Sequence, residues 1–325
     1  MSIRSVSRIT PFLALLPSLL LGASLAACSD EGGLTGPPDP PPIPVIDSAR
    51  VFAFANTAEN RMQGLLHTVF GGQQLGTPNP FLLPTLGAPR AATSARLAAA
   101  ASACAPVQTG VDTNGVAIDT DVDGIPDDNT VDFGAGCSVM DGGLEFTFSG
   151  KYRLRDPGGG IMDWEYTTTA LAARVRDTVT GDFIRQQVNG SESAHFSAAH
   201  AAHQMDVTLD VRSGSGADST HVTLRTLTAS TYDPSGGSSF QLHGSLPQGT
   251  FALAAELVFR DIAVGADSQR FVITTPTPIH TAFACDSGID GGVLEGLFEG
   301  DERVGFQFTW PGCSAPFIQV FGTTP

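Results

Sequence analysis

The chain has 325 residues, of which 42% are hydrophobic and 15% charged, and it contains 37 glycines and 22 prolines. This apolar content excludes a wholly disordered protein, and glycine without a fixed repeat excludes a collagen-like one. Acidic residues outnumber basic residues 33 to 17, for a formal net charge of −16. The surface therefore lacks the positive charge that a nucleic-acid partner would need. What remains is a folded, turn-rich protein.

The N-terminal segment, residues 1–27, is typical of a secretory signal peptide. Arg4 and Arg8 give it a basic start, and a mainly apolar run follows. A membrane-spanning helix is the alternative, but such a helix needs about 20 consecutive apolar residues. Pro11 and Pro17 interrupt this shorter run, so the sequence predicts an exported protein.

The signal segment ends in Leu25-Ala26-Ala27-Cys28, with small residues before a cysteine. This motif resembles the lipobox of bacterial lipoproteins, in which the cysteine is lipidated on sulfur with chains such as palmitate and becomes the acylated N-terminus. The resemblance implies that Cys28 anchors the protein to a membrane, because two or more acyl chains give stable anchoring. Ser29 stands where the enterobacterial signal for retention in the inner membrane is Asp. The resemblance therefore implies an outer-membrane location, and leaves open whether the protein faces the periplasm or the cell surface.

Residues 28–46 form a proline-rich spacer, which is expected to be extended at about 3 Å per residue. Residues 47–103 are expected to be a helical and loop segment. Apolar residues recur at helical spacing from Ser48 to Phe70, which predicts an amphipathic helix packed against the body of the protein. A helix lying on a membrane is the alternative, but no Lys/Arg-rich polar face accompanies it. Residues 73–89 are expected to be a loop, and the alanine-rich stretch 90–103 favours a second helix.

Residues 104–325 change to the alternating pattern of β-strands, with turn residues about every ten positions. Leu144-Glu-Phe146-Thr-Phe148 is one example, and Asn114-Gly115 is typical of a two-residue hairpin turn. About a dozen consecutive strands with short connections predict a mainly β fold built as an antiparallel meander. The meander is expected to be a sandwich or a half-open barrel, with one or two N-terminal helices.

The cysteine count fits an exported protein. If Cys28 carries lipid, four cysteines remain, and four allow three disulfide pairings in an oxidising compartment. Sequence proximity favours Cys104–Cys137 and Cys285–Cys313. A zinc site made of all four thiolates is the alternative, but the chain has no close Cys-x-x-Cys pair.

The segment at residues 119–132 is a candidate calcium loop. It begins Asp119-Thr-Asp121-Val-Asp123-Gly124-Ile125-Pro-Asp127, with carboxylates at positions 1, 3, 5 and 9 and glycine at position 6, as in an EF-hand loop that wraps a hard cation. An Asp- and Gly-rich turn exposed to solvent is the alternative. Without a cation, however, the crowded carboxylates would repel one another.

The same residues resemble the calcium loops of thrombospondin type 3 repeats. The resemblance implies that four aspartates donate side-chain oxygens and that Ile125 donates its carbonyl. At position 12 those families carry an acidic residue, whereas this chain has Thr130 with Asp128 and Asp132 on either side, which is expected to weaken binding. The bound calcium is expected to be structural. The candidate ligands are Asp119, Asp121, Asp123, Ile125, Asp127 and Asp132.

Two further patterns invite a catalytic interpretation. His195, His200 and His203 could suggest a zinc site, but the flanking alternation favours strands, on which their spacing does not converge. Surface or loop histidines are the better expectation. Asp286-Ser287-Gly288 is similar to the active-site loop of aspartic proteases, but those enzymes pair two such loops and this chain has one. We assign no catalytic residue from the sequence.

The sequence thus predicts a lipid-anchored envelope lipoprotein with a β-rich binding or structural domain stabilised by calcium. A periplasmic carrier of an apolar ligand is one alternative, and a pocket lined by phenylalanines would favour it. A secreted hydrolase is another, and Ser, His and Asp or convergent carboxylates in a cleft would favour that.

Overall fold

The computed structural model describes residues 46–70, 94–215, 218–241, 245–262, 268–282, 285 and 288–323. The predicted signal peptide, Cys28, the spacer up to residue 45, the loop at 73–89 and the pair Asp286-Ser287 lie outside these residues. Among the helices of the described ranges, none has the length and apolar character needed to cross a membrane.

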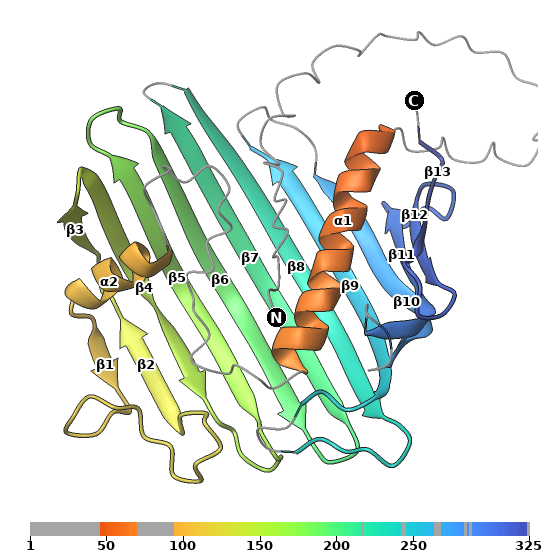
Figure 1. Ribbon diagram of the computed structural model, residues 1–325. Helices are drawn as coiled ribbons and strands as arrows, with labels where there is room; N and C mark the ends of the chain where they lie inside the picture. The colour runs from red at the N-terminus through yellow and green to blue at the C-terminus, as the bar shows by residue number, and fades with distance from the viewer. Residues whose placement is uncertain are drawn as a thin grey trace, which may run out of the picture.

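The described chain is dominated by one antiparallel sheet of thirteen strands that is not closed (Figure 1). Neighbouring strands of the sheet follow one another in chain order, with one exception. Strands β2 and β3 both pair with β4. This confirms the predicted mainly β meander in its half-open form. The strands are β1 (Val107–Thr109), β2 (Asp128–Asp132), β3 (Cys137–Asp141), β4 (Leu144–Arg155), β5 (Trp164–Asp177), β6 (Phe183–Phe196), β7 (Ala201–Ser215), β8 (Asp218–Pro234), β9 (Gly249–Asp261), β10 (Gln269–Thr281), β11 (Ile289–Phe298), β12 (Gly305–Trp310) and β13 (Phe317–Phe321).

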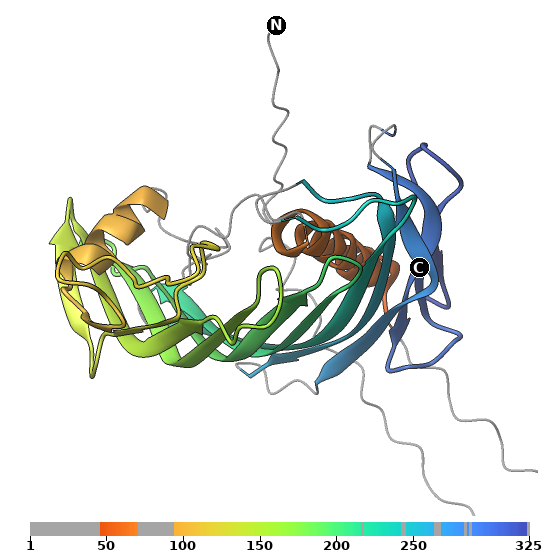
Figure 2. The ribbon, with the colours of Figure 1, turned by 90° about the horizontal axis from the view of Figure 1, so that it is seen from below.

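The sheet is strongly curved, and both helices lie on its concave side (Figure 2). Because side chains alternate along a strand, one face can be apolar and packed while the other meets water. The outer face accordingly carries cross-strand ion pairs, such as Asp206–Arg225 and Glu256–Arg270. The concave face carries the buried aromatic residues.

The first helix fills one half of the concave face. Helix α1 (Ser48–Gly64) continues as a π-helical turn, Leu65–Val69, so the predicted helix is confirmed. Its apolar stripe is buried against β11, β12 and β13, and Phe54 stacks on Phe271 with ring centroids 4.1 Å apart. Phe298 of β11 and Phe306 and Phe308 of β12 are therefore used by the core that α1 covers. Fully buried members of this main core include Val51, Met62, Phe251, Phe271, Phe306 and Phe308.

The second helix, α2 (Ser94–Ala103), covers a smaller core at the other end of the sheet. Leu97 and Ala100 pack with Phe146 and Phe148 of β4. Arg96 pairs with Asp141 at 2.6 Å, which joins α2 to β3. The second predicted helix therefore also exists, and it begins at Ser94 within the described residues.

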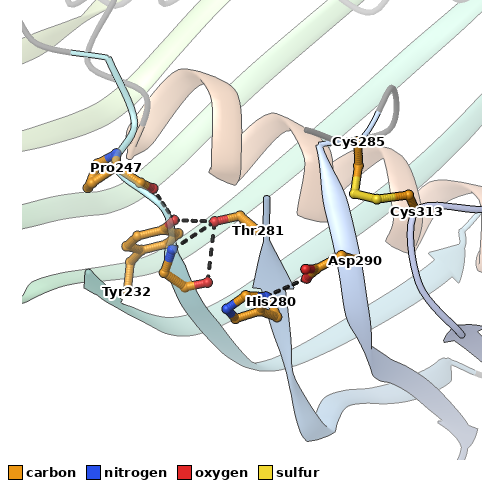
Figure 3. Close-up of polar contacts among 8 residues, drawn as sticks. Tyr232, Pro247, His280, Thr281, Cys285, Asp290 and Cys313 are labelled. Carbon is orange, nitrogen blue, oxygen red and sulfur yellow. Dashed lines mark hydrogen bonds and ion pairs between the residues drawn. A yellow bond between two sulfur atoms is a disulfide. The ribbon is translucent and has the colours of Figure 1, made fainter. Parts of the chain in front are cut away.

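Both disulfides join the partners that sequence proximity favours. Cys104, directly after α2, is bonded to Cys137 of β3, with Cα atoms 5.9 Å apart. Cys285 is bonded to Cys313, with Cα atoms 4.8 Å apart, and joins the segment after β10 to the β12–β13 connection (Figure 3). Each core therefore has its own cross-link.

Candidate functional site

The predicted calcium loop brings three carboxylates together. Oxygen atoms of Asp119, Asp121 and Asp123 lie within 4.8 Å of one another. The chain can turn this tightly because Val122 and Gly124 adopt left-handed backbone angles, with φ of 61° and 96°. Such convergence of hard oxygen donors could hold a metal ion.

Backbone N–H groups of the same turn fix the orientation of these carboxylates. Val122 and Gly124 donate to the two oxygens of Asp119 at 2.8 and 3.0 Å, and Ile125 donates to Asp123 at 2.7 Å. The Ile125 side chain is only 1% exposed and belongs to the main core. Packing of Ile125 therefore ties the acidic turn to the body of the fold.

The structure adds an acidic neighbour that the sequence analysis missed. Burial raises the pKa of Asp123, and the charges of Asp121, Asp156 and Asp119 raise it further. Asp156 follows β4, and its backbone N–H donates to the carbonyl of Pro126 at 2.9 Å. Burial also raises the pKa of Asp156, and the charge of Asp121 adds to the effect. No local sequence signal marks Asp156, because the end of β4 places it beside the loop.

The other two predicted acidic ligands are bonded elsewhere. The carboxylate of Asp127 accepts hydrogen bonds from the hydroxyl and the backbone N–H of Thr120, which lower its pKa. Asp132, on β2, accepts a bond from the backbone N–H of Gly134 at 2.6 Å. Neither belongs to the group of three converging carboxylates. The structure thus brings together three of the six predicted ligands, Asp119, Asp121 and Asp123.

A second polar group lies on the concave face, around His203 of β7. Its side chain is 0% exposed, so the expectation of a surface or loop histidine is wrong for this residue. His203 Nε2 lies 2.8 Å from Glu192 of β6, and its Nδ1 lies 3.4 Å from the hydroxyl of Ser230 on β8. Ala201 and His203 are two residues apart on β7, so their side chains lie on the same face of the sheet. Ala201 is buried in the main core, and the strand register places His203 beside it on that face.

Two buried donors beside this group have no hydrogen-bond partner within the described residues. They are the indole N–H of Trp164 and the hydroxyl of Tyr166, both on β5. Tyr166 pairs with Glu192 across β5 and β6, and the ring centroid of Trp164 lies 6.1 Å from that of His203. Buried polar groups without partners are costly and uncommon in folded proteins, which makes this part of the concave face unusual.

Ser230, His203 and Glu192 are the residue types of a hydrolytic serine, histidine and carboxylate, so their contact must be compared with the hydrolase alternative. A hydrolytic serine must reach its substrate, whereas Ser230 is 3% exposed and His203 is fully buried. Their hydrogen bonds join β6, β7 and β8 within the core. The contact is therefore explained by packing across three adjacent strands.

The structure also shows a shallow hollow of about 510 Å³, lined mainly by side chains of the outer face. It spans β6 to β10, where the small side chains of Ala229 and Ala254 leave room between the carboxylates of Asp206 and Glu256. No phenylalanine lines it. This hollow therefore differs from the phenylalanine-lined pocket that would favour an apolar-ligand carrier.

The chain matches no protein-family model, no curated protein and no solved structure.

Proposed function

We propose that this protein is a lipid-anchored envelope lipoprotein whose half-open β domain is a binding or structural module stabilised by calcium. The convergence of Asp119, Asp121 and Asp123 supports the calcium site. The lipobox resemblance at Cys28 supports the anchor and, with Ser29, the outer-membrane location. The even number of remaining cysteines, paired in the fold, suits an oxidising compartment.

Calcium is the cation that suits the acidic turn best. The available ligands are oxygens in a flexible loop, which favours a large hard cation over zinc, whose usual ligands are nitrogen and sulfur. Asp156 lies close enough to influence the pKa of Asp123 and could add a further oxygen ligand. A bound cation would neutralise the repulsion among these carboxylates and hold the loop, through Ile125, against the main core.

Thermal unfolding of the full chain in detergent tests the metal. At about 5 mM calcium, matching weak extracellular affinities, the melting temperature should rise, because a ligand of the folded state stabilises it by mass action. Magnesium should act less, because it demands stricter octahedral geometry. Asp121→Asn with Asp123→Asn should abolish the calcium shift. Asp206→Asn, which removes an exposed carboxylate from the outer face, should keep it.

A calcium shift that is absent from the wild-type chain, or that survives the double substitution, would remove the site. Incorporation of a palmitate analogue tests the anchor separately. It should label the wild-type chain and be lost in Cys28→Ala. Unchanged labelling of Cys28→Ala would contradict the lipoprotein proposal.

A carrier of an apolar ligand is the second candidate, and the middle of the concave face favours it. There Val207, Leu209 and Leu224 remain partly exposed between the two cores. On β5 of the same sheet, the buried donors of Trp164 and Tyr166 have no partner among the described residues. A fluorescent fatty acid would bind this surface with its chain on the apolar residues. Leu209→Glu should then weaken binding. Thr208→Glu, which places the same charge on the opposite face of β7, should not.

A further inference from the structure

The two ends of the open sheet differ in how their edges are protected. A free edge strand exposes unpaired backbone N–H and C=O groups, and proteins commonly protect it with charges, with short strands or with a covering element. At the first end, β1 has three residues. Strand β3 is cross-linked through Cys137 and ion-paired to α2 through Asp141.

The edge at the other end is less protected within the described residues. The Cys285–Cys313 disulfide joins the connection before β13 and not the strand itself, and α1 packs on the concave face of this end. Strand β13 pairs only with β12 in the described part of the chain. Its sequence is Phe317-Ile-Gln-Val-Phe321 and carries no charge, and its neighbour β12, Gly-Phe-Gln-Phe-Thr-Trp, carries none either. Phe317 is 69% exposed and Ile318 is 41% exposed. An uncharged, apolar edge of five residues is suited to pairing with another strand.

The sequence of β13 indicates which kind of strand would pair with this edge. Read from either end, it is nearly the same, with phenylalanine at both ends, an aliphatic residue next to each end and Gln319 at the centre. Antiparallel pairing of two copies about Gln319 would place Phe317 opposite Phe321 and Ile318 opposite Val320. A two-fold symmetric contact requires this self-complementarity, because each residue must suit its counterpart in both directions.

We propose that β13 pairs with β13 of a second copy of this chain, in antiparallel register centred on Gln319, to form a two-fold symmetric dimer with one continuous sheet. Phenylalanine pairs would lie on the outer face and Ile–Val pairs on the concave face, beside α1, where Val320 already packs against the main core. Such cross-strand apolar pairs are the units that stabilise a sheet. Because β12 and β13 carry no charged side chain, none of these strands' residues would bring like charges together across the axis.

Cysteine cross-linking tests the register. Gln319→Cys places two thiols opposite each other across the axis, so mild oxidation of the full chain in detergent should give an interchain disulfide. Phe321→Cys is the matched control. In this register its two copies lie four residues apart along the strands, about 14 Å, beyond the roughly 7 Å that a disulfide spans between Cα atoms. Combining Phe317→Cys with Phe321→Cys should restore the cross-link.

The protein mass in detergent, measured by light scattering, tests the dimer without cysteine. The wild-type chain should have the mass of two copies. Gln319→Lys should give monomers, because it places like charges opposite each other. Gln307→Lys, a lysine on the same face of β12, should leave the dimer intact. A monomeric wild-type chain, equal cross-linking of Gln319→Cys and Phe321→Cys, or a dimer that survives Gln319→Lys would overturn the proposal.

Discussion

Tyr232 is the centre of a buried hydrogen-bond group that joins three strands, and removing its hydroxyl gives a sharp test of the fold. The side chain lies fully buried on the concave face of β8. Its hydroxyl donates to the carbonyl of Pro247, just before β9, and is bonded to the hydroxyl of Thr281 on β10 (Figure 3). The Thr281 hydroxyl also accepts a bond from the backbone N–H of Gly249 at 3.1 Å.

The cost of Tyr232→Phe follows from what is left behind. The Pro247 carbonyl loses this donor, and an unpaired buried acceptor costs about 1–3 kcal/mol. Thr281 loses its bond to the phenol but keeps a contact with the carbonyl of Gly249 at 3.3 Å, so its penalty is smaller. We expect a loss of about 2 kcal/mol, which for a domain of this size lowers the melting temperature by about 4–8 °C.

Tyr166→Phe is the matched control, because the same atom is removed from a different environment. The Tyr166 hydroxyl is buried without a partner in the described part of the chain, so its removal should be neutral or stabilising. Thermal and urea unfolding measure both variants. A cycle combining Tyr232→Phe with Thr281→Val should show a coupling of about 1 kcal/mol. Equal losses of unfolding free energy in Tyr232→Phe and Tyr166→Phe would refute the stabilising role of this hydrogen-bond group. Additive effects of Tyr232→Phe and Thr281→Val would refute it as well.

Three further predictions concern pH, packing and cross-linking. Burial raises the pKa of all three tyrosines of the chain, that of Tyr232 to about 12, from an ordinary value of 10. Above pH 10 the unfolded chain therefore loses these protons first, so stability should fall as pH rises from 10 towards 12, and tyrosinate absorbance should appear at lower pH in the unfolded chain than in the folded one. Gly249→Ala should lower the unfolding free energy by about 1–3 kcal/mol, because an added Cβ would lie 2.4 Å from the Asp233 carbonyl oxygen. Gly291→Ala should be mild in the same assay, because its Cβ would meet its nearest atom at 3.8 Å. Replacing Cys104 and Cys137 by alanine should lower the unfolding free energy by about 3–4 kcal/mol in urea titrations, and no loss would show that this cross-link does not stabilise the smaller core.

The sequence predicted the elements whose signals are local. Helical spacing identified α1, alternation identified the meander, and proximity identified the two disulfides. Features that depend on neighbouring strands could not be predicted in this way. His203 is buried because the register of β6, β7 and β8 places it beside Glu192 and Ser230, and Asp156 approaches the acidic turn only because β4 ends there.

The acidic turn lies between the two cores, so its stability affects how firmly the cores are joined. It leads directly into β2, whose Val131 belongs to the smaller core, while Ile125 belongs to the main core. Tyr152 of β4 packs against both cores, so the turn and this tyrosine lie where the two cores meet. Each core already has its own helix and its own disulfide, which stabilise it internally and do little to join it to the other. A cation at this turn would fix Ile125 relative to β2, and so it would act on the coupling between the cores. Unfolding of the whole domain, and not of one core, is therefore the transition that calcium should shift.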